Sequence, residues 1–480
     1  MNALVQQILD TGFTQTIDGR PVATQFEDVI NPATGAPFHR SPVATAEELD
    51  AAVAAARRAQ PAWAALSWDE REALINKLAD AMEANAEYLS TLNTMEQGMI
   101  VAESAMLLAG AVVSLRIIAK VRAPGRVLAD TATNRVTETW CPLGVVGAIA
   151  PWNAPVILGM QKVVTALIGG NTIVLKPSEL TPLGTLEIGR IAREILPPGV
   201  FNVIGGGREV GAALVAHRGV DKVSFTGSTA TGIHIARQSS EFLRPVTLEL
   251  GGNDAAILLP DGSIDAMVSE TLRVGLANRG QFCAAIKRVY VPSALYEEVC
   301  EKLVAAAAPI RLGDGLEPGT DMGPIQNKAQ FDKICRFVEE ARAAGGKILI
   351  GGEPLAGEGY FYPPTVVAGL SDGVRLVDEE QFGPVVPVIA YDDLDAVIDA
   401  INAGPYGLTG SIWTADLEKG AQVAARLTIG TGWVNQHGAF DPLYPFPLIK
   451  DSGMGTDWAD HGVKGTMRLQ VVNARKPVAA

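Results

Sequence analysis

The pattern of apolar and polar positions divides the chain into stretches of different period. Residues 45 to 119 have the helical period, and capping-box spacings at Thr45 to Glu48 and Ser67 to Glu70 each precede an Ala- and Leu-rich run. From 121 to 139 charged and apolar residues alternate with period two. This alternation predicts an exposed β-hairpin.

Strands and helices then alternate regularly. Short β runs end in loops at Lys176 to Glu179, Gly205 to Gly207 and Phe225 to Ser228, with amphipathic helical stretches between them. This repeat predicts an α/β fold with a parallel sheet, whose ligands bind beyond the carboxyl ends of the strands. A second α/β stretch follows Gly252. The terminal segment 466–474 has the pattern of a strand that could pair with the hairpin.

Composition narrows the class of protein. The chain has 480 residues, which corresponds to about three domains. With 48% apolar and 19% charged residues it can bury large cores, which argues against disorder. The formal net charge is −14 and Lys and Arg do not cluster, so nothing predicts binding of nucleic acid or an anionic membrane. We expect a protein that handles small molecules.

Cysteine usage and the apolar runs point to the cytoplasm. The 4 cysteines are widely spaced and form no CxxC, so the sequence predicts neither a disulfide framework nor a metal site. The first residues include Asp10 and lack both a positively charged N-terminal region and a cleavage pattern, so we expect no secretion signal. The uncharged run from Cys141 to Gln161 contains Pro142, Pro151 and Pro155. It therefore predicts strand, loop and helix start rather than a membrane span.

Two glycine-rich turns are candidates for binding phosphate. Gly205 to Gly207 resemble a dinucleotide fingerprint, but Val210 breaks the G-x-G-x-x-G spacing, so a tight turn against a packed helix is the better interpretation. Gly227 and Ser228 leave a strand and open a helix. The amide groups and dipole of that helix end would favour a phosphate, although this signal alone is weak.

Cys283 is the candidate nucleophile, because it lies in the glycine-led loop that begins at Gly280. Cys300 and Cys335 lie within amphipathic helices and are better interpreted as small buried hydrophobes. A nucleophilic cysteine needs an environment that favours the thiolate, which in hydrolases is usually a histidine base. None of the 5 histidines lies in a recognisable partner motif, so a cysteine protease is poorly supported.

Glu249 and Asn153 are candidates to complete such a site. Glu249 ends an apolar strand just before two glycines, where burial would raise the pKa of its carboxyl toward that of a general base. The alternative is a solvated strand end. Asn153, held between Pro151 and Pro155, could donate to an oxyanion, and its alternative role is that of a turn residue.

Taken together, these segments resemble the successive motifs of the aldehyde dehydrogenase superfamily, in its order and spacing and over nearly the whole chain. The motifs are Asn31 to Gly35, Trp152-Asn153, Leu175 to Glu179, Phe225 to Ser228, Glu249 to Gly252, Gly280 to Cys283, Asp321 to Pro324, Glu380 to Pro384 and Ser452 to Gly455.

The resemblance implies an NAD(P)-dependent oxidation of an aldehyde to a carboxylic acid. Cys283 would attack the carbonyl, giving a thiohemiacetal, and the Asn153 side chain and the Cys283 amide would hold the oxyanion. Hydride would leave for the nicotinamide. Glu249 would then activate water to hydrolyse the thioester, and Lys162 matches a family lysine that supports the site.

The resemblance also implies the cofactor residues. Lys176 and Glu179 match positions at the adenosine ribose, Glu380 and Phe382 match positions at the nicotinamide ribose, and the residues near the pyrophosphate are Trp152, Gly227 and Ser228. A carboxylate at Glu179 would repel a 2′-phosphate, so we expect NAD rather than NADP. The alternative is that Glu179 is a solvated helix-start residue that leaves the choice of cofactor open.

The family architecture implies three parts. Residues 1–119 with 143–251 would form the NAD-binding domain, and 252–450 the catalytic domain. The hairpin 120–142 with the tail 463–480 would form an oligomerisation flap. The polar hairpin has little core of its own, which suggests pairing with a partner's terminal strand in a homodimer or homotetramer.

Departures from the family pattern affect the substrate side. Asn253 replaces a usual Lys, and Pro445 to Leu448 replace a usual glycine pair at the rim of the substrate funnel. Small residues at Ala154 and Ala277 stand where many members carry aromatic ones, while the walls Phe282 and Phe440 remain aromatic. The tunnel is therefore expected to be apolar and wide, suited to a bulky aliphatic or aromatic aldehyde.

Two alternatives remain open at the level of sequence. A coenzyme A-acylating relative is one, but such enzymes generally lack the water-activating glutamate that Glu249 supplies here. A catalytically silent protein that kept the fold is the other, and the presence of Cys283, Glu249 and Asn153 argues against it. Formation of NADH with a panel of aldehydes would distinguish them.

Overall fold

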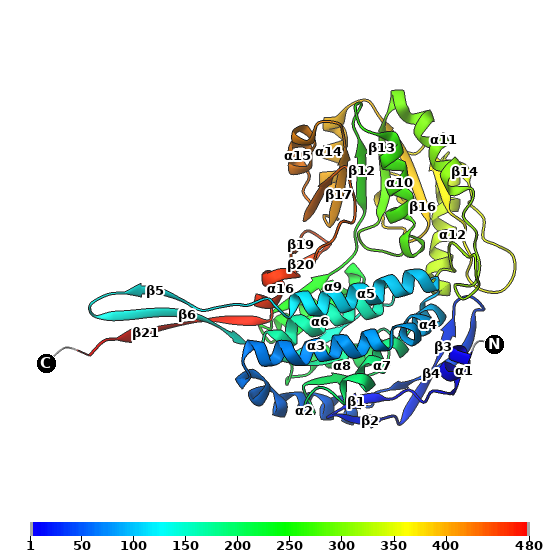
Figure 1. The fold of residues 1–480 in the computed structure, drawn as a ribbon. Helices are drawn as coiled ribbons and strands as arrows, with labels where there is room; N and C mark the ends of the chain where they lie inside the picture. Colours follow the sequence, from blue (N-terminus) through cyan, green and yellow to red (C-terminus); the bar gives the residue numbers. More distant parts are fainter. Residues whose placement is uncertain (1–2, 478–480) are drawn as a thin grey trace.

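The computed structural model describes residues 3–477. Two α/β lobes, each built on its own sheet, lie one above the other, and a long β-ribbon projects away from both (Figure 1). The predicted α/β class is confirmed. The first two and last three residues, which fall within the expected NAD-binding domain and flap, lie outside the described residues.

The first sheet has nine strands, of which the central five are parallel. In spatial order they are β19 (Phe446–Leu448), β20 (Gly453–Asp457), β11 (Val246–Glu249), β10 (Lys222–Thr226), β7 (Val145–Ile149), β8 (Thr172–Lys176), β9 (Phe201–Val203), β1 (Gln15–Ile17) and β2 (Arg20–Val22). Strand β19 belongs to this sheet although the sequence placed it in the catalytic range.

Helices cover both faces of the first sheet (Figure 1). They are α1 (Ala3–Asp10), α2 (Ala46–Ala65), α3 (Trp68–Ala84), α4 (Ala86–Gln97), α5 (Val101–Ile118), α6 (Pro155–Ile168), α7 (Leu183–Ala192), α8 (Arg208–Ala216), α9 (Thr229–Ser240) and α16 (Ala459–Lys464). The predicted capping boxes at Thr45 and Ser67 are both formed. A two-stranded hairpin, β3 (Gln25–Asn31) and β4 (Ala36–Val43), extends this lobe.

The second sheet has seven strands and its own apolar core. In spatial order they are β14 (Lys347–Ile350), β15 (Thr365–Ala368), β16 (Val385–Tyr391), β13 (Ile286–Pro292), β12 (Asp254–Leu258), β17 (Thr409–Trp413) and β18 (Thr431–Val434). Its helices are α10 (Ile264–Gly275), α11 (Tyr296–Ala307), α12 (Lys328–Ala343), α13 (Arg375–Asp378), α14 (Leu394–Ala403) and α15 (Leu417–Arg426), with 3₁₀ turns η1 (Ala277–Gly280) and η2 (Ser293–Leu295).

The projecting ribbon is the predicted hairpin, β5 (Arg126–Asp130) and β6 (Asn134–Pro142), joined by the terminal strand β21 (Met467–Arg475). Strand β21 pairs with β6 of its own chain along its whole length, from Met467 opposite Pro142 to Arg475 opposite Asn134. Pairing with the terminal segment is confirmed, but the expectation that a partner supplies that strand is wrong. The chain leaves α16 beside the base of β6, where Leu143 N donates to Thr466 O, so its own tail is already in place.

One described helix, α5, is long and apolar enough to cross a membrane by length and composition alone. The core helices of globular proteins pass the same test. In this fold α5 packs against α3, α4 and α6 in the first lobe. The run from Cys141 to Gln161 forms the end of β6, all of β7, a loop and the start of α6, as its prolines predicted.

Candidate active site

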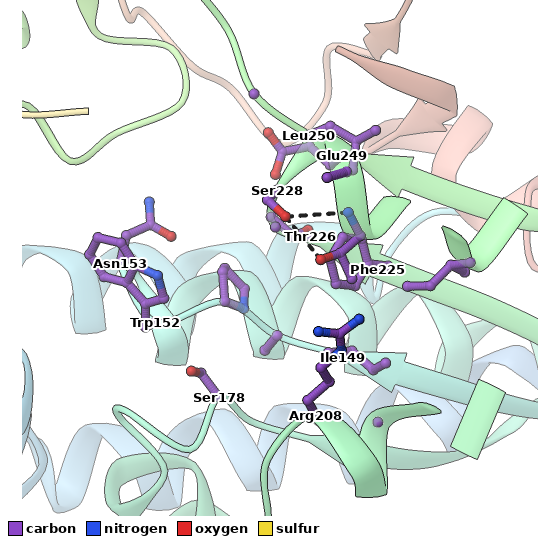
Figure 2. Close-up of a pocket in the computed structure, with 18 of the residues that line it drawn as sticks. Ile149, Trp152, Asn153, Ser178, Arg208, Phe225, Thr226, Ser228, Glu249 and Leu250 are labelled. Carbon is purple, nitrogen blue, oxygen red and sulfur yellow. Dashed lines mark hydrogen bonds between the residues drawn. The ribbon is translucent and has the colours of Figure 1, made fainter. Parts of the chain in front are cut away.

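A cleft of about 660 Å³ lies at the carboxyl ends of β7, β8, β10 and β11, as the order of strands and helices predicted. Trp152, Ser178, Ser228 and Glu249 line it from the first lobe (Figure 2). Cys283, Glu380 and Phe382 line it from the second lobe. A smaller cavity of about 40 Å³ lies on the far side of Cys283.

A left-handed turn carries Cys283 to the junction of these two cavities. Asn278, Arg279 and Gly280 have φ values of 49°, 58° and 70°. A Cβ on Gly280 would lie 2.1 Å from Gly383 O, so only glycine fits there. Two consecutive non-glycine residues in this region store backbone strain, which is typical of functional loops. Arg279 supports the turn by donating to Pro324 O and Gln97 O.

Glu249 ends β11 and lines both cavities with Cys283. Its carboxylate is buried, and neither oxygen has a hydrogen-bond partner of normal geometry within residues 3–477. Burial raises the pKa of Glu249 to about 7, although the nearby Cys283 thiol and Lys162 oppose this. The solvated strand end considered from the sequence is therefore wrong, and the group is placed to hold or release a proton near neutral pH.

The thiol and the lysine are also perturbed. Burial raises the pKa of Cys283 well above its ordinary range, and the negative charges of Glu249, Glu380 and Asp254 add to this. Cys283 is therefore a thiol at rest and needs a base. Lys162, on α6, donates to Ser224 Oγ at 3.3 Å, and burial lowers its pKa against the charge of Asp457.

Asn153 is buried in the loop before α6, and its Nδ2 donates to Gln281 O at 3.0 Å. An amide nitrogen carries two hydrogens, so one remains for a ligand. The side chains of Gln97 and Asn278 both donate to Asn153 O, at 3.0 and 2.7 Å. Sequence reasoning missed these two supports, because their role depends on contacts between segments far apart in the chain.

The expected adenosine residues lie together at the end of β8. Lys176 Nζ donates to Pro177 O and Gly206 O and lies 3.6 Å from a carboxylate oxygen of Glu179. The Lys176 side chain is buried, whereas that of Glu179 is 42% exposed and free to meet a ligand. Gly205 to Gly207 form the tight turn inferred from the sequence, since a Cβ on Gly205 would lie 1.9 Å from Pro42 O.

The expected pyrophosphate residues lie at the start of α9. Ser228 is the N-cap of this helix, accepting from Thr231 N at 3.3 Å (Figure 2). Gly227 precedes it and lines the cleft. Trp152, from the opposite wall, packs edge-on against Phe382 with ring centroids 5.5 Å apart. The helix end therefore faces a ligand-sized space with its free amides.

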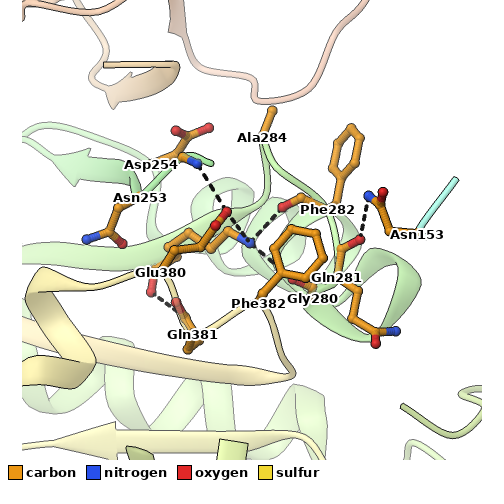
Figure 3. Close-up of polar contacts among 12 residues, drawn as sticks. Asn153, Asn253, Asp254, Gly280, Gln281, Phe282, Ala284, Glu380, Gln381 and Phe382 are labelled. Carbon is orange, nitrogen blue, oxygen red and sulfur yellow. Dashed lines mark hydrogen bonds and ion pairs between the residues drawn. The ribbon is translucent and has the colours of Figure 1, made fainter. Parts of the chain in front are cut away.

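Glu380, whose side chain is 14% exposed, lies at the other end of the cleft and accepts from Gly252 N at 3.1 Å. Lys287, a residue that the sequence did not single out, lies 3.7 Å from Glu380 Oε1 and 4.6 Å from the centre of the Phe382 ring (Figure 3). Burial raises the pKa of Glu380, and the positive charge of Lys287 opposes that rise.

The smaller cavity is apolar and aromatic but not wide. Phe282 and Phe440 line it as expected, in edge-on contact at 5.8 Å. Trp458 also lines it, stacked on Phe446 at 5.0 Å, and these two rings leave only about 40 Å³. The expected width is wrong, because the ring of Trp458 occupies part of this space. No motif in the sequence predicted that Trp458 would line it.

The two alanines of the expected tunnel lie elsewhere. Ala154 lines a separate cavity of about 10 Å³ among α4, α5 and α6. Ala277 begins η1 and lines neither of the larger cavities. Gln161, on α6, does line the smaller cavity, where it is a polar side chain in an apolar wall. Among residues 3–477 no group of three or more His, Cys, Asp or Glu could hold a metal ion.

A cysteine and a buried carboxylate therefore meet in a cleft of about 660 Å³ at the carboxyl ends of a parallel sheet, which is where nucleotide cofactors bind in this class of fold. The model of the aldehyde dehydrogenase family matches residues 20–472. The chain is 37% identical to betaine aldehyde dehydrogenase from Cereibacter sphaeroides, over 92% of each protein. It is 35% identical to geranial dehydrogenase from Castellaniella defragrans, over 94% of this chain and 96% of that one.

Solved structures agree. The NAD⁺ complex of aldehyde dehydrogenase from Bacillus cereus superposes with a TM-score of 0.96 at 35% identity, over 99% of both chains. The chain belongs to the aldehyde dehydrogenase family. It is therefore an enzyme that oxidises aldehydes with a nicotinamide cofactor, and the resemblance read from its motifs is confirmed.

Proposed function

We propose that this enzyme oxidises an apolar aldehyde to its carboxylic acid with NAD⁺, through a thiohemiacetal and then a thioester on Cys283. One observation carries the proposal. A cysteine and a buried glutamate, whose oxygens have no hydrogen-bond partner of normal geometry among residues 3–477, meet where the large cleft joins the small cavity. We further propose 1–119 with 143–251 as the NAD-binding domain, 252–450 apart from β19 as the catalytic domain, and 120–142 with 463–480 as the flap.

The first half of the reaction uses Glu249 as the base for the thiol. Cys283 is a thiol at rest, and Glu249, with a pKa near 7, accepts its proton. The sulfur attacks the aldehyde carbon, and the oxygen becomes an oxyanion. The free hydrogen on Asn153 Nδ2 and the Cys283 amide donate to it, while Lys162 adds positive charge behind Glu249.

The residues of the cleft fit a dinucleotide. When bound, NAD⁺ supplies the acceptor for the hydride that leaves the thiohemiacetal carbon. Lys176 and Glu179 would hold the adenosine ribose, Glu380 would hold the nicotinamide ribose, and the N-terminus of α9 at Ser228 would face the pyrophosphate. Trp152 and Phe382 would close the cleft around the middle of the cofactor.

In the second half, Glu249 first releases to solvent the proton that it took from the thiol, and the carboxylate then acts as a base again. Its two buried oxygens have room for a water molecule in the shared space beside Cys283. The carboxylate removes a proton from that water as the oxygen attacks the thioester, and Cys283 leaves as the thiolate. A coenzyme A-acylating enzyme does not need a base that activates water, so hydrolysis is the better supported fate of the thioester.

The small cavity sets the proposed substrate class. Its aromatic walls favour an apolar aldehyde, while the stacked rings of Trp458 and Phe446 restrict the width beside Cys283. A bulky aldehyde therefore requires these rings to move. Trp458→Ala should raise kcat/KM for branched or bicyclic aldehydes at least ~10-fold relative to a straight-chain one, since burying each extra methylene gives about 0.8 kcal/mol. An unchanged ratio across an aldehyde panel, followed by NADH absorbance, would show that Trp458 does not limit size.

Glu179 is proposed to favour NAD over NADP. A 2′-phosphate beside its carboxylate would bring like charges together, and ~1.4 kcal/mol of repulsion corresponds to tenfold in affinity. Wild type should therefore prefer NAD, and Glu179→Ser should raise the ratio of kcat/KM for NADP over NAD by ~10-fold or more. Wild-type preference for NADP, or an unchanged ratio of kcat/KM for NADP over NAD in the variant, would show that Glu179 does not discriminate between the two cofactors.

The flap is proposed to join subunits into a homodimer or homotetramer. Five of its apolar side chains, Val127, Leu128, Leu469, Val471 and Val472, are 45–54% exposed. Exposed apolar side chains on a projecting ribbon are typical of a surface that another chain covers. Light scattering of the intact chain should then give two or four times the mass of one subunit.

A further inference from the structure

The nucleophile loop is held by a buried lysine outside the motifs that define the site. Lys287, on β13, is 1% exposed, and its Nζ donates to Phe282 O at 2.6 Å and to Gly280 O at 3.1 Å. Its remaining polar neighbour is Glu380 Oε1, at 3.7 Å. Figure 3 labels Gly280, Phe282 and Glu380, whose oxygen atoms surround Lys287 Nζ.

The surroundings of Lys287 suit an ammonium ion rather than an amine. An ammonium has three donors, and the two carbonyl oxygens and the Glu380 carboxylate supply three acceptors. The face of the Phe382 ring, 4.6 Å from Nζ, also favours a cation. A neutral amine would have to turn its lone pair toward one of these oxygens. Burial lowers the pKa of Lys287, whereas the charges of Glu380 and Asp254 act to keep the proton on it.

The contact with Phe282 O affects the Cys283 N–H, because both atoms belong to the same peptide group. The carbonyl of Phe282 and the N–H of Cys283 are parts of one planar, conjugated peptide group. A cation that binds the oxygen draws electron density from the nitrogen and makes its N–H a stronger donor. The Cys283 N–H is the donor that, in the proposed function, faces the oxyanion.

We propose that Lys287 polarises the Phe282–Cys283 peptide and so strengthens the oxyanion-binding amide, while its contact with Glu380 ties that amide to the nicotinamide end of the cofactor cleft. The inference rests on the proposed function, in which Cys283 forms tetrahedral adducts. Lys287 is a positioning residue: it contacts the peptide group and a cofactor-binding carboxylate rather than the reactants.

Three reactions of the holoenzyme and its variants separate this role from a structural one. Aldehyde oxidation requires both the oxyanion site and the cofactor. Cleavage of p-nitrophenyl acetate requires Cys283 and the oxyanion site but no hydride transfer: sulfur attacks the carbonyl, p-nitrophenolate leaves, and water hydrolyses the thioester. Alkylation of Cys283 by iodoacetamide displaces iodide and forms no oxyanion.

Lys287→Met should lower the rate of ester cleavage relative to alkylation by ~10- to 100-fold. Removing an oxyanion donor outright costs about 10²–10³, and here the donor is only weakened. Lys287→Gln, which keeps N–H donors but not the charge, should fall between wild type and Lys287→Met, and it decides the question if the Met variant does not fold. KM for NAD should change less than kcat in both variants.

Lys333→Met is the matched control. Lys333 is a second lysine beside Glu380, where its Nζ donates to the backbone oxygen at 2.7 Å. Its hydrogen bond is to Glu380 and not to the nucleophile loop, so the ratio of ester cleavage to alkylation should stay at the wild-type value.

Equal losses of ester cleavage and alkylation in the Lys287 variants would overturn the inference, and so would no loss in either. Cys283→Ala distinguishes failure of the proposed function from failure of the inference about Lys287. If that variant still cleaves the ester, the nucleophile is wrong and the proposed function fails. If Cys283 is essential but the Lys287 variants keep the wild-type ratio, only the inference fails.

Discussion

Replacing Cys283 with alanine should lower aldehyde oxidation by ~10⁴-fold or more, because loss of an enzyme nucleophile removes the covalent path altogether. NADH absorbance with excess aldehyde measures this directly. Binding of NAD should stay near the wild-type value, since the residues proposed for the ribose and pyrophosphate, such as Lys176 and Ser228, lie on other segments of the cleft.

Two other cysteines serve as controls for this substitution. Cys300 is buried in the core beneath the second sheet, and Cys335 packs on the opposite face of that sheet. Cys300→Ala and Cys335→Ala should therefore keep wild-type turnover apart from any loss of stability. Substantial turnover by Cys283→Ala with both of these thiols intact would remove Cys283 as the nucleophile.

Replacing Glu249 with glutamine should separate the two halves of the reaction. Without the base, deacylation stalls, so the variant should release up to one NADH per active site and then stop, provided that the thiol can lose its proton to another acceptor. Stopped-flow absorbance measures the burst. Glu96→Gln is the control, because Glu96 is also buried with a raised pKa but caps α7 through Leu183 N and Gly184 N. It should turn over steadily.

The pH dependence follows from the same carboxyl. A pKa raised to about 7 means that Glu249 is mainly protonated below that pH and cannot accept a proton from the thiol or from water. Steady-state kcat of the wild type should therefore rise with pH through about 7. Turnover by Glu249→Gln at the wild-type rate, with the same pH profile, would refute the role of base.

The sequence predicted those parts of the fold that depend on local patterns. The capping boxes at Thr45 and Ser67, the hairpin and the strand-loop-helix units all arise from contacts between residues close in the chain. The positions of Cys283 and Glu249 were also predictable, because Cys283 follows a glycine-led loop and Glu249 ends an apolar strand just before two glycines. Their burial and proximity required the structure.

What the sequence could not supply depends on packing between distant segments. Trp458 narrows the smaller cavity because its ring, stacked on Phe446, lines the space beside Cys283. Lys287 looks like any charged residue in a strand until β13 is placed beneath the nucleophile loop. The terminal strand could have paired in either chain by pattern alone. The short link from α16 to β21 decides the pairing by placing Thr466 against Leu143.

The central claim is that the aldehyde carbon is oxidised while it is bound to Cys283, and that Glu249 then releases it. Intact-protein and peptide mass spectrometry of Glu249→Gln, mixed with one aldehyde and NAD⁺, tests this most directly. Provided that the thiol can lose its proton to another acceptor in this variant, a stable adduct should form on the peptide containing Cys283, with the mass of the aldehyde less two hydrogen atoms. NADH formation with no adduct on Cys283, or with an adduct on another residue, would contradict it.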